Sequence, residues 1–142
     1  TESYQTWPDP VFDPGYTARS KSTALNMCAV GEKMAQVLNA AGIRTHIMAG
    51  IIPLKAAGMA RYMNENVPGI AVPQDMIDKL AAAAAEGKEK GVKGLPMQLG
   101  IEMAAEMIAK IKDEHLCDGV HIMAIGAEKN VPAILEKAGV TI

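Results

Sequence analysis

A lysine and two histidines occupy positions in this chain that could support chemistry. Lys55 comes directly after an apolar run that ends at Pro53 and Leu54, as at the exit of a buried strand. Ligands bind at the carboxyl ends of parallel strands, so Lys55 is a candidate ligand contact. His46 and His121 lie inside apolar runs, away from such ends. A histidine there is more often a hydrogen-bonded core residue than a catalyst, and we interpret both as structural.

The sulfur-containing side chains form no metal or disulfide motif. Cys28 and Cys117 are far apart and belong to no CxxC or Cys/His pattern, so we expect two buried thiols in a reducing compartment. Methionine is abundant, with 10 residues, while aromatic residues make up only 4% of the chain. Methionine fills irregular cores, and it can also line a flat apolar ligand such as a flavin or a pterin. Core filling is the simpler interpretation, and ligand lining is the alternative.

The segment around Lys55 predicts a strand, a sharp exit and a short helix. Residues 46–54 are almost continuously apolar, which is typical of a strand buried on both faces of a helix-covered parallel sheet. Pro53 cannot donate to a sheet ladder and should end the strand. The string HIMAIG at 121–126 echoes HIMAG at 46–50. Two similar strand–helix units in one α/β sheet would explain the echo, and chance is the alternative for such short strings.

Helices are predicted from apolar periodicity and from their end signals. They cover residues 23–41, 56–66, 73–85 with Gly87 as the end, 96–114 and 132–138. Residues 119–126 predict a further strand. The polar, glycine-punctuated segment 86–94 predicts a solvated surface loop, because its glycine spacing matches no phosphate-binding motif.

Residues 1–22 are rich in proline and aromatic side chains, and the prolines at 8, 10 and 14 forbid a regular helix. We expect a short strand ending near Thr6 and then a long loop, which is either functional or a disordered terminus. The chain has 142 residues, 49% of them hydrophobic, and a formal net charge of −2. This composition is typical of a globular domain and argues against a nucleic-acid partner. The absence of a signal peptide and of a membrane-length apolar run predicts a cytoplasmic protein.

The order of predicted elements alternates strands with helices, which implies parallel pairing and right-handed crossovers. Three parallel strands alone would leave long edges exposed. We therefore predict an α/β fold of the (β/α)8 TIM-barrel type. Residues 1–142 would form a single partial-barrel domain of about the last three βα units, with an irregular start at 1–22. Because the chain begins at Thr1 without methionine, we expect it to be processed or to belong to a longer polypeptide.

Two stretches resemble a known family. GIIPLKAAGMARYMNENVPGI at 50–70 and GVHIMAIGAEKNVPAILEKAGV at 119–140 resemble the carboxyl-terminal portion of methylenetetrahydrofolate reductase, particularly the bacterial and archaeal type of one-carbon metabolism. The resemblance implies strands six to eight of a barrel that holds FAD and reduces methylenetetrahydrofolate to methyltetrahydrofolate. The family's proton-donating glutamate and most of its FAD contacts belong to regions outside this chain. The catalytic and cofactor-binding residues are therefore not assigned here.

The resemblance also implies substrate-binding residues. The family's sixth strand ends in a Thr-Gln pair, which Gln5 and Thr6 resemble, although the alignment could instead place Trp7 there. Lys55 would meet the glutamate carboxylates of the folate, with a solvated lysine as the alternative. Met59 and Met63 could form an apolar wall against the pterin or flavin.

Two positions depart from the family pattern. Met59 stands where the NADH-dependent branch has glutamine, and Ala127 stands where it has arginine. Because of these departures, the sequence does not show which residues contact the folate tail. It also does not show whether the electron donor is NAD(P)H or a ferredoxin-linked subunit. Glu128 and Lys129 follow the last strand and could also reach the site.

The favoured hypothesis is an oxidoreductase in which this chain supplies the folate side, together with an oligomer partner or the remainder of the barrel. The alternative is a non-catalytic folate-binding or barrel-completing module that needs a partner chain. A third hypothesis is a different flavin or pterin barrel, such as a methyltetrahydrofolate methyltransferase. The two quoted stretches resemble the reductase more closely than such a protein. The presence of the preceding half of the barrel in the natural polypeptide would separate the first two hypotheses.

Overall fold

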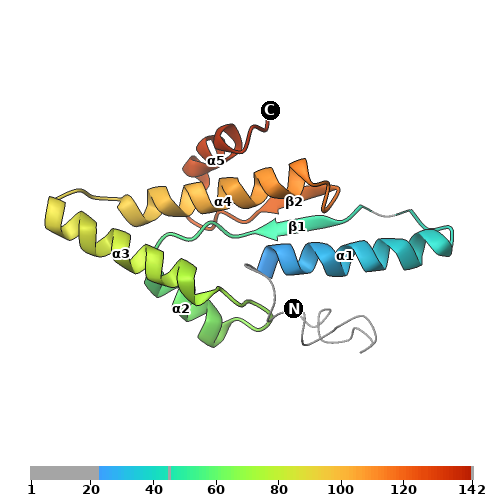
Figure 1. Cartoon of the computed structure of the whole chain (residues 1–142), viewed down its shortest axis with the longest axis horizontal. Coiled ribbons are helices and arrows are strands. Elements are labelled where there is room, and N and C mark those ends of the chain that lie inside the picture. The colour runs from blue at the N-terminus through green and yellow to red at the C-terminus, as the bar shows by residue number, and fades with distance from the viewer. Residues whose placement is uncertain (1–22, 45, 142) are drawn as a thin grey trace.

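A computed structural model describes residues 23–44 and 46–141 of the chain (Figure 1). Its elements are α1 (Thr23–Ala40), β1 (Met48–Ile51), α2 (Ala57–Asn66), α3 (Gln74–Lys90), α4 (Leu95–Asp113), β2 (Gly119–Ile122), the 3-10 helix η3 (Glu128–Asn130) and α5 (Val131–Lys137). The strand expected near Thr6 and the loop after it lie outside the described residues, together with the candidates Gln5 and Thr6. The helix predictions agree with the structure to within one residue at most ends, apart from the end of α3.

β1 and β2 form a parallel sheet in which Met48 is opposite Gly119 and Ile51 is opposite Ile122. The predicted parallel pairing is therefore confirmed for these two strands. Ile47 and Asp118, which directly precede β1 and β2, are joined by two hydrogen bonds. The Ile47 N–H donates to the Asp118 carboxylate at 2.7 Å, and the Asp118 N–H donates to the Ile47 carbonyl at 2.9 Å. Both strands are shorter than predicted. β2 lies between a bend at residues 117–118 and a turn at residues 125–126, and β1 ends two residues before Pro53, which has no N–H to donate to a ladder.

The echoing strings lie on neighbouring strands, as the prediction of two units in one sheet requires. They do not occupy equivalent positions, because His121 is opposite Gly50 and not opposite His46. The second string is therefore shifted along the sheet by four residues (50 − 46). The two similar strings therefore belong to neighbouring parallel strands, but they do not form an exact structural repeat.

One face of the sheet packs against α4 and α5 (Figure 1). We call this cluster the sheet core; its buried residues are Ala49, Ile51, Ala104, Ala105, Ile108, Ile111, Ile134 and Ala138. The other face is open in the described part of the chain, where the Met48 side chain is 54% exposed. The expectation of burial on both faces is therefore wrong for these residues. α1 reaches β1 near Gly31 and Ile47 and leaves Met48 uncovered.

α2 and α3 pack together in a second cluster, beside the exit of β1. We call it the helical core; its buried residues are Leu54, Ala57, Ala60, Met63, Ile77 and Leu80. α3 does not end at Gly87 as predicted but continues to Lys90, and Gly91 ends it with a φ of +65°. Gly87 is needed for a close approach, since a Cβ there would lie 2.7 Å from the Val92 carbonyl oxygen. The loop predicted over residues 86–94 is thus only the turn 91–94.

α4 crosses the exit of β1 at Gly100. A Cβ on Gly100 would overlap the carbonyl oxygen of Leu54, so only glycine lets the helix lie on this backbone. Leu54 belongs to the helical core, whereas the following turns of α4 belong to the sheet core. The two cores therefore meet at this crossing.

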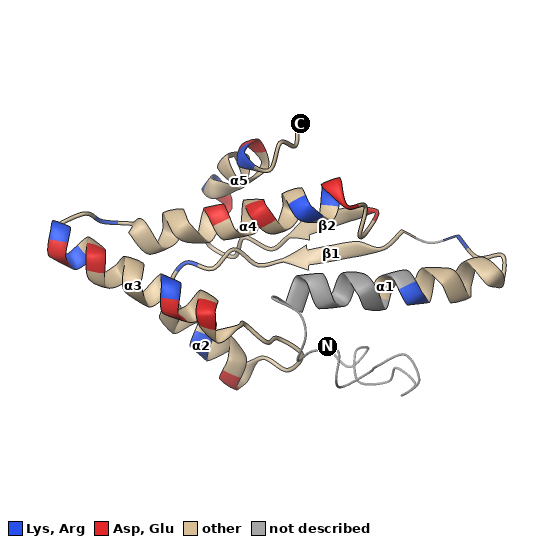
Figure 2. Cartoon of the chain, viewed as in Figure 1, with Lys and Arg blue, Asp and Glu red and all other residues tan. Residues whose placement is uncertain are grey.

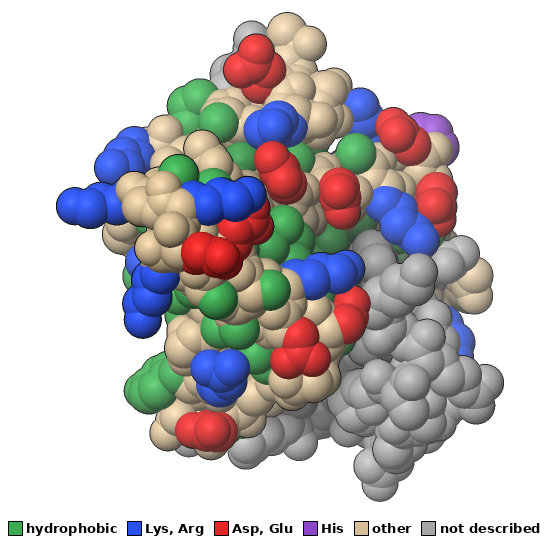
Figure 3. Space-filling model, turned by 60° about the vertical axis from the view of Figure 1, so that its left-hand side comes forward, with side chains coloured by type: hydrophobic (Ala, Val, Ile, Leu, Met, Phe, Trp, Pro, Cys, Tyr) green, Lys and Arg blue, Asp and Glu red, His purple; other side chains and the backbone are tan. Residues whose placement is uncertain are grey.

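Charged side chains lie on the outer faces of α3 and α4, with both signs present (Figure 2). Lys79 pairs with Asp75 at 3.7 Å and Lys90 with Glu86 at 2.6 Å, one helical turn apart. On the side of the molecule drawn in Figure 3, acidic and basic side chains are interspersed, and neither sign dominates. None of the described helices is long and apolar enough to cross a membrane.

Candidate functional site

Lys55 and Glu128 come together at the carboxyl end of the sheet. Lys55 follows β1 and Glu128 follows β2, and parallel pairing brings both exits to the same edge. The Lys55 Nζ donates to the Ile125 carbonyl oxygen at 2.8 Å. The Gly126 N–H donates to Glu128 Oε1 at 2.8 Å. Both side chains therefore bind one short segment, residues 123–127, which we call the β2 exit loop.

The β2 exit loop is a tight turn. The Ala127 N–H donates to the Ala124 carbonyl at 2.6 Å, and Gly126 has a φ of +67°, a conformation that favours glycine. A Cβ on Gly126 would lie 3.6 Å from the Lys55 Nζ, so the ammonium packs directly beside the turn. Ile125, at the tip, is 67% exposed. The loop thus presents one apolar side chain beside one cation.

Glu128 is held as a carboxylate. Hydrogen bonds from its own backbone N–H and from that of Gly126 lower the pKa of Glu128; burial opposes this effect, and the nearby charge of Lys55 adds a lesser lowering effect. The ammonium of Lys55 has three N–H donors. One bond to Ile125 therefore leaves donors that an anionic or polar ligand could use.

The two predicted methionines lie in different environments. Met59, in the first turn of α2, is half-buried and packs against the margin of the helical core. Met63 lies inside that core and is only 7% exposed. Of the pair, Met59 keeps part of its surface available, whereas Met63 supports α2 from beneath.

Two further methionines line the open face of the sheet, and the sequence analysis did not single them out. The Met48 Sδ lies 2.8 Å from the position that a Cβ on Gly119 would take. The Met123 Cε lies 2.9 Å from the corresponding position on Gly50. Each methionine thus lies across a glycine of the neighbouring strand. The signal was present in the sequence as a methionine and a glycine close together in both strand regions.

The histidines are not core residues, contrary to the prediction. His46 lies before β1 and is exposed, and His121 is exposed in β2 at a position on the open face. The apolar runs around them indicated burial, but the described elements cover only the other face. Cys117 is half-buried against the sheet core, and the side chain of Cys28 lies outside the described part. Within the described residues, no group of three His, Cys, Asp or Glu side chains could hold a metal ion.

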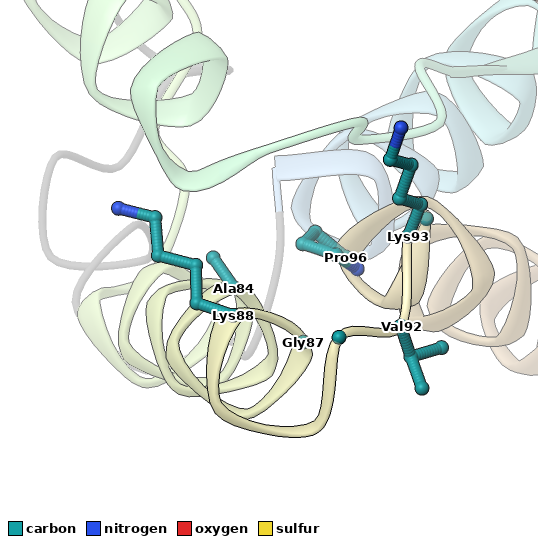
Figure 4. A pocket seen from close by; sticks show the side chains of 8 residues that line it. Ala84, Gly87, Lys88, Val92, Lys93 and Pro96 are labelled. Atoms are coloured by element: carbon teal, nitrogen blue, oxygen red, sulfur yellow. The ribbon is translucent and has the colours of Figure 1, made fainter.

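A separate hollow lies at the turn between α3 and α4 (Figure 4). Its volume is about 380 Å³, and it is lined by Ala84, Gly87, Lys88, Gly91, Val92, Lys93, Gly94 and Pro96. Lys88 and Lys93 extend outward from its rim in Figure 4. None of these lining residues belongs to the strand exits, so this hollow is distinct from the edge that carries Lys55 and Glu128.

The comparisons with known proteins concern this same region. The family model for methylenetetrahydrofolate reductase matches residues 32–139, which include both strands, both strand exits and α5. No curated protein matches the chain. The matched family is one of oxidoreductases with a TIM-barrel fold, and the observed parallel α/β arrangement agrees with that class. Because the match covers well over half of the sequence, this chain belongs to the methylenetetrahydrofolate reductase family.

Proposed function

We propose that this chain supplies the folate-side, carboxyl-terminal part of a barrel that reduces methylenetetrahydrofolate to methyltetrahydrofolate. The observation that carries the proposal is the convergence of two parallel strand exits at one edge, inside the region that the family matches. That edge holds a cation with free donors, Lys55, and an exposed apolar side chain, Ile125. A folate carries carboxylates and aromatic rings. Lys55 could bind the carboxylates, and Ile125 could contact the rings.

Lys55 is our candidate for the carboxylates of the folate. Its ammonium is partly exposed, is held in place by the Ile125 carbonyl and keeps donors for a second partner. Met59 lies on the first turn of α2 and supplies the apolar contact beside it, while Met63 holds that helix from within the core. Gln5 and Thr6 remain candidates from the strand that we expect to precede α1.

The proposal of a partial barrel draws support from the open side of the sheet. β1 and β2 pair with each other in the described residues, and one face of the pair carries the uncovered side chain of Met48. Continuous apolar sequence and an uncovered face together favour further strands that close over this side. We expect the strand near Thr6 to add to the free edge of β1.

FAD is the cofactor expected for the complete enzyme. When bound, it would accept hydride from the reductant and deliver it to the methylene carbon of the folate. Met48 and Met123 fit the apolar surface of a flat ring system. The turn 91–94 has none of the glycine spacing of a phosphate-binding loop. The family resemblance implies that the main FAD contacts lie outside this chain, and we expect the electron donor to be NAD(P)H or a ferredoxin-linked subunit.

The first test is the intact mass of the natural protein, paired with its visible absorption spectrum and an assay of methylenetetrahydrofolate reduction. We expect a mass well above that of this chain, a flavin band and turnover. A mass equal to this chain, with no flavin and no turnover, would instead favour the alternative function. That alternative is a non-catalytic module that completes the barrel of a partner chain, and the open face of the sheet is the observation in its favour.

A further inference from the structure

The bonds made by Lys55 and Glu128 end on a single peptide group. The Ile125 carbonyl oxygen, which accepts from Lys55, and the Gly126 N–H, which donates to Glu128, belong to the same peptide bond. The cation therefore binds the negative end of this peptide dipole, and the anion binds the positive end. Both hydrogen bonds are assisted by charge, and each polarises the peptide in the direction that strengthens the other.

We propose, on the basis of the function proposed above, that Lys55 and Glu128 are positioning residues that clamp the Ile125–Gly126 peptide in one orientation at the ligand-binding edge. The clamp joins the exits of the two strands through side chains rather than through the sheet ladder.

The loop needs such a clamp because its own backbone restrains this peptide weakly. Gly126 has no Cβ and can adopt other backbone conformations at little cost, so the peptide before it could rotate and exchange the places of its C=O and N–H. A rotated peptide would turn its N–H toward the ammonium of Lys55 and its carbonyl toward the carboxylate of Glu128. Both contacts would then be repulsive. The two side chains thus select one orientation electrostatically.

The clamp predicts different consequences for the two residues. Lys55 has two roles, one toward the peptide and one toward the ligand carboxylate, whereas Glu128 acts only through the loop. Loss of Glu128 should therefore weaken ligands with and without a glutamate tail by the same factor. Loss of Lys55 should weaken the ligand with the tail more.

The test combines amide exchange with ligand binding in the natural full-length protein. In Glu128→Gln and Lys55→Met we expect hydrogen exchange at the Gly126 amide to become about two- to tenfold faster, the range for one hydrogen bond. Lys55→Arg keeps the charge and the donors and should restore most of the protection. Glu136→Gln removes an exposed charge of α5 and serves as the matched control with unchanged exchange.

The binding probes are 5-methyltetrahydrofolate and its analogue without the glutamate tail. We expect Glu128→Gln to raise both dissociation constants about equally and Lys55→Met to raise the first more. Unchanged Gly126 exchange in both variants, or exchange in the wild type as fast as in a free peptide, would overturn the clamp even if folate binds. If the wild type binds neither probe while Gly126 exchange responds as expected, the proposed function fails and the clamp itself stands.

Discussion

The sheet core and the helical core are built from residues at very different separations along the chain. The sheet core joins Ile51 of β1 to Ile108 of α4 and Ile134 of α5. The helical core is local, because all of its buried residues fall between Leu54 and Leu80. Local contacts cost less loop-closure entropy, so we expect the helical core to open more readily than the sheet core. The comparison predicts that the two cores differ in local stability and share one junction.

The candidate site occupies that junction. Lys55 directly follows Leu54, whose side chain lies in the helical core and whose carbonyl lies against α4 at Gly100. The partner loop of Lys55 follows β2, which belongs to the sheet core. The position of the ammonium therefore depends on both cores, and variants that disturb either core separately can measure each contribution.

The largest effects should come from cavities in the two cores. Ile108→Ala and Leu80→Ala each remove a fully buried side chain, and we expect each to lower the free energy of unfolding by about 2–5 kcal/mol. Ile108→Ala should expose the amides of both strands to hydrogen exchange. Leu80→Ala should affect α2, α3 and the start of α4, whose Leu99 packs against this core, and leave the strands protected. Chemical denaturation and residue-resolved exchange measure both predictions.

Val37→Ala is the control for these cavities, because Val37 is an exposed residue of α1 and its truncation should change stability by no more than about 0.5 kcal/mol. If Leu80→Ala also deprotects β1 and β2 to the same extent, the two cores unfold as one unit, and the comparison drawn above is wrong.

The next effect concerns the junction itself. In Gly100→Ala the new methyl group collides with the Leu54 carbonyl, so α4 must move away from the exit of β1. We expect a loss of about 1–3 kcal/mol in unfolding free energy and faster exchange in both cores. Gly58→Ala is the matched control. A Cβ on Gly58 in α2 meets nothing within 4 Å, and alanine favours a helix, so stability should be unchanged or slightly higher.

The sequence predicted the helices well, because apolar spacing and end signals lie within short segments, and it predicted the parallel pairing from the alternation of strands with helices. α4 shows this, since its apolar spacing and its start next to Pro96 place it within one residue of the observed bounds. Gly87 shows the limit. A glycine that ends a helix and a glycine that admits a neighbouring carbonyl look the same in a sequence, and only the fold brings Val92 back to it.

The candidate site was predictable in part for the same reason. Lys55 could be identified from its place after an apolar run that ends in proline. Its partner on the β2 exit loop is 70 residues away in the sequence, and the contact exists because of the strand register. The exposure of His121 and Met48 could not be predicted either, because an apolar pattern predicts burial but does not identify the element that covers each face.

A smaller effect should be confined to the helical core. Asn64 binds the backbone of Val72 on both sides: its Oδ1 accepts from the Val72 N–H at 2.7 Å, and its Nδ2 donates to the Val72 carbonyl at 3.0 Å. Asn64→Ala should therefore loosen the connection between α2 and α3 and cost about 1 kcal/mol or somewhat more. Exchange at Val72 should accelerate, while the strands keep their protection.

The control for Asn64 is Asn66→Ala. Asn66 makes one bond, from its Nδ2 to the Tyr62 carbonyl on the same helix, so its truncation should cost less than that of Asn64. Equal losses in the two variants would contradict a specific role of Asn64 in the connection.

The smallest effect is the acid titration of Glu128, and it should be confined to the junction. Its pKa lies below the ordinary value of 4.5, chiefly because the backbone N–H groups of Glu128 and Gly126 bind the carboxylate, with a lesser contribution from Lys55. A group whose pKa is lowered by folding stabilises the folded state above its ordinary pKa, and that contribution is lost as the pH falls through the lowered value. The Gly126 amide shift should therefore titrate with a midpoint below 4.5 in the wild type and not titrate in Glu128→Gln. In Lys55→Met the midpoint should rise only part of the way, because the hydrogen bonds remain. A wild-type midpoint at or above the ordinary value would mean that the carboxylate does not bind the peptide, and the two strand exits would then be joined by Lys55 alone.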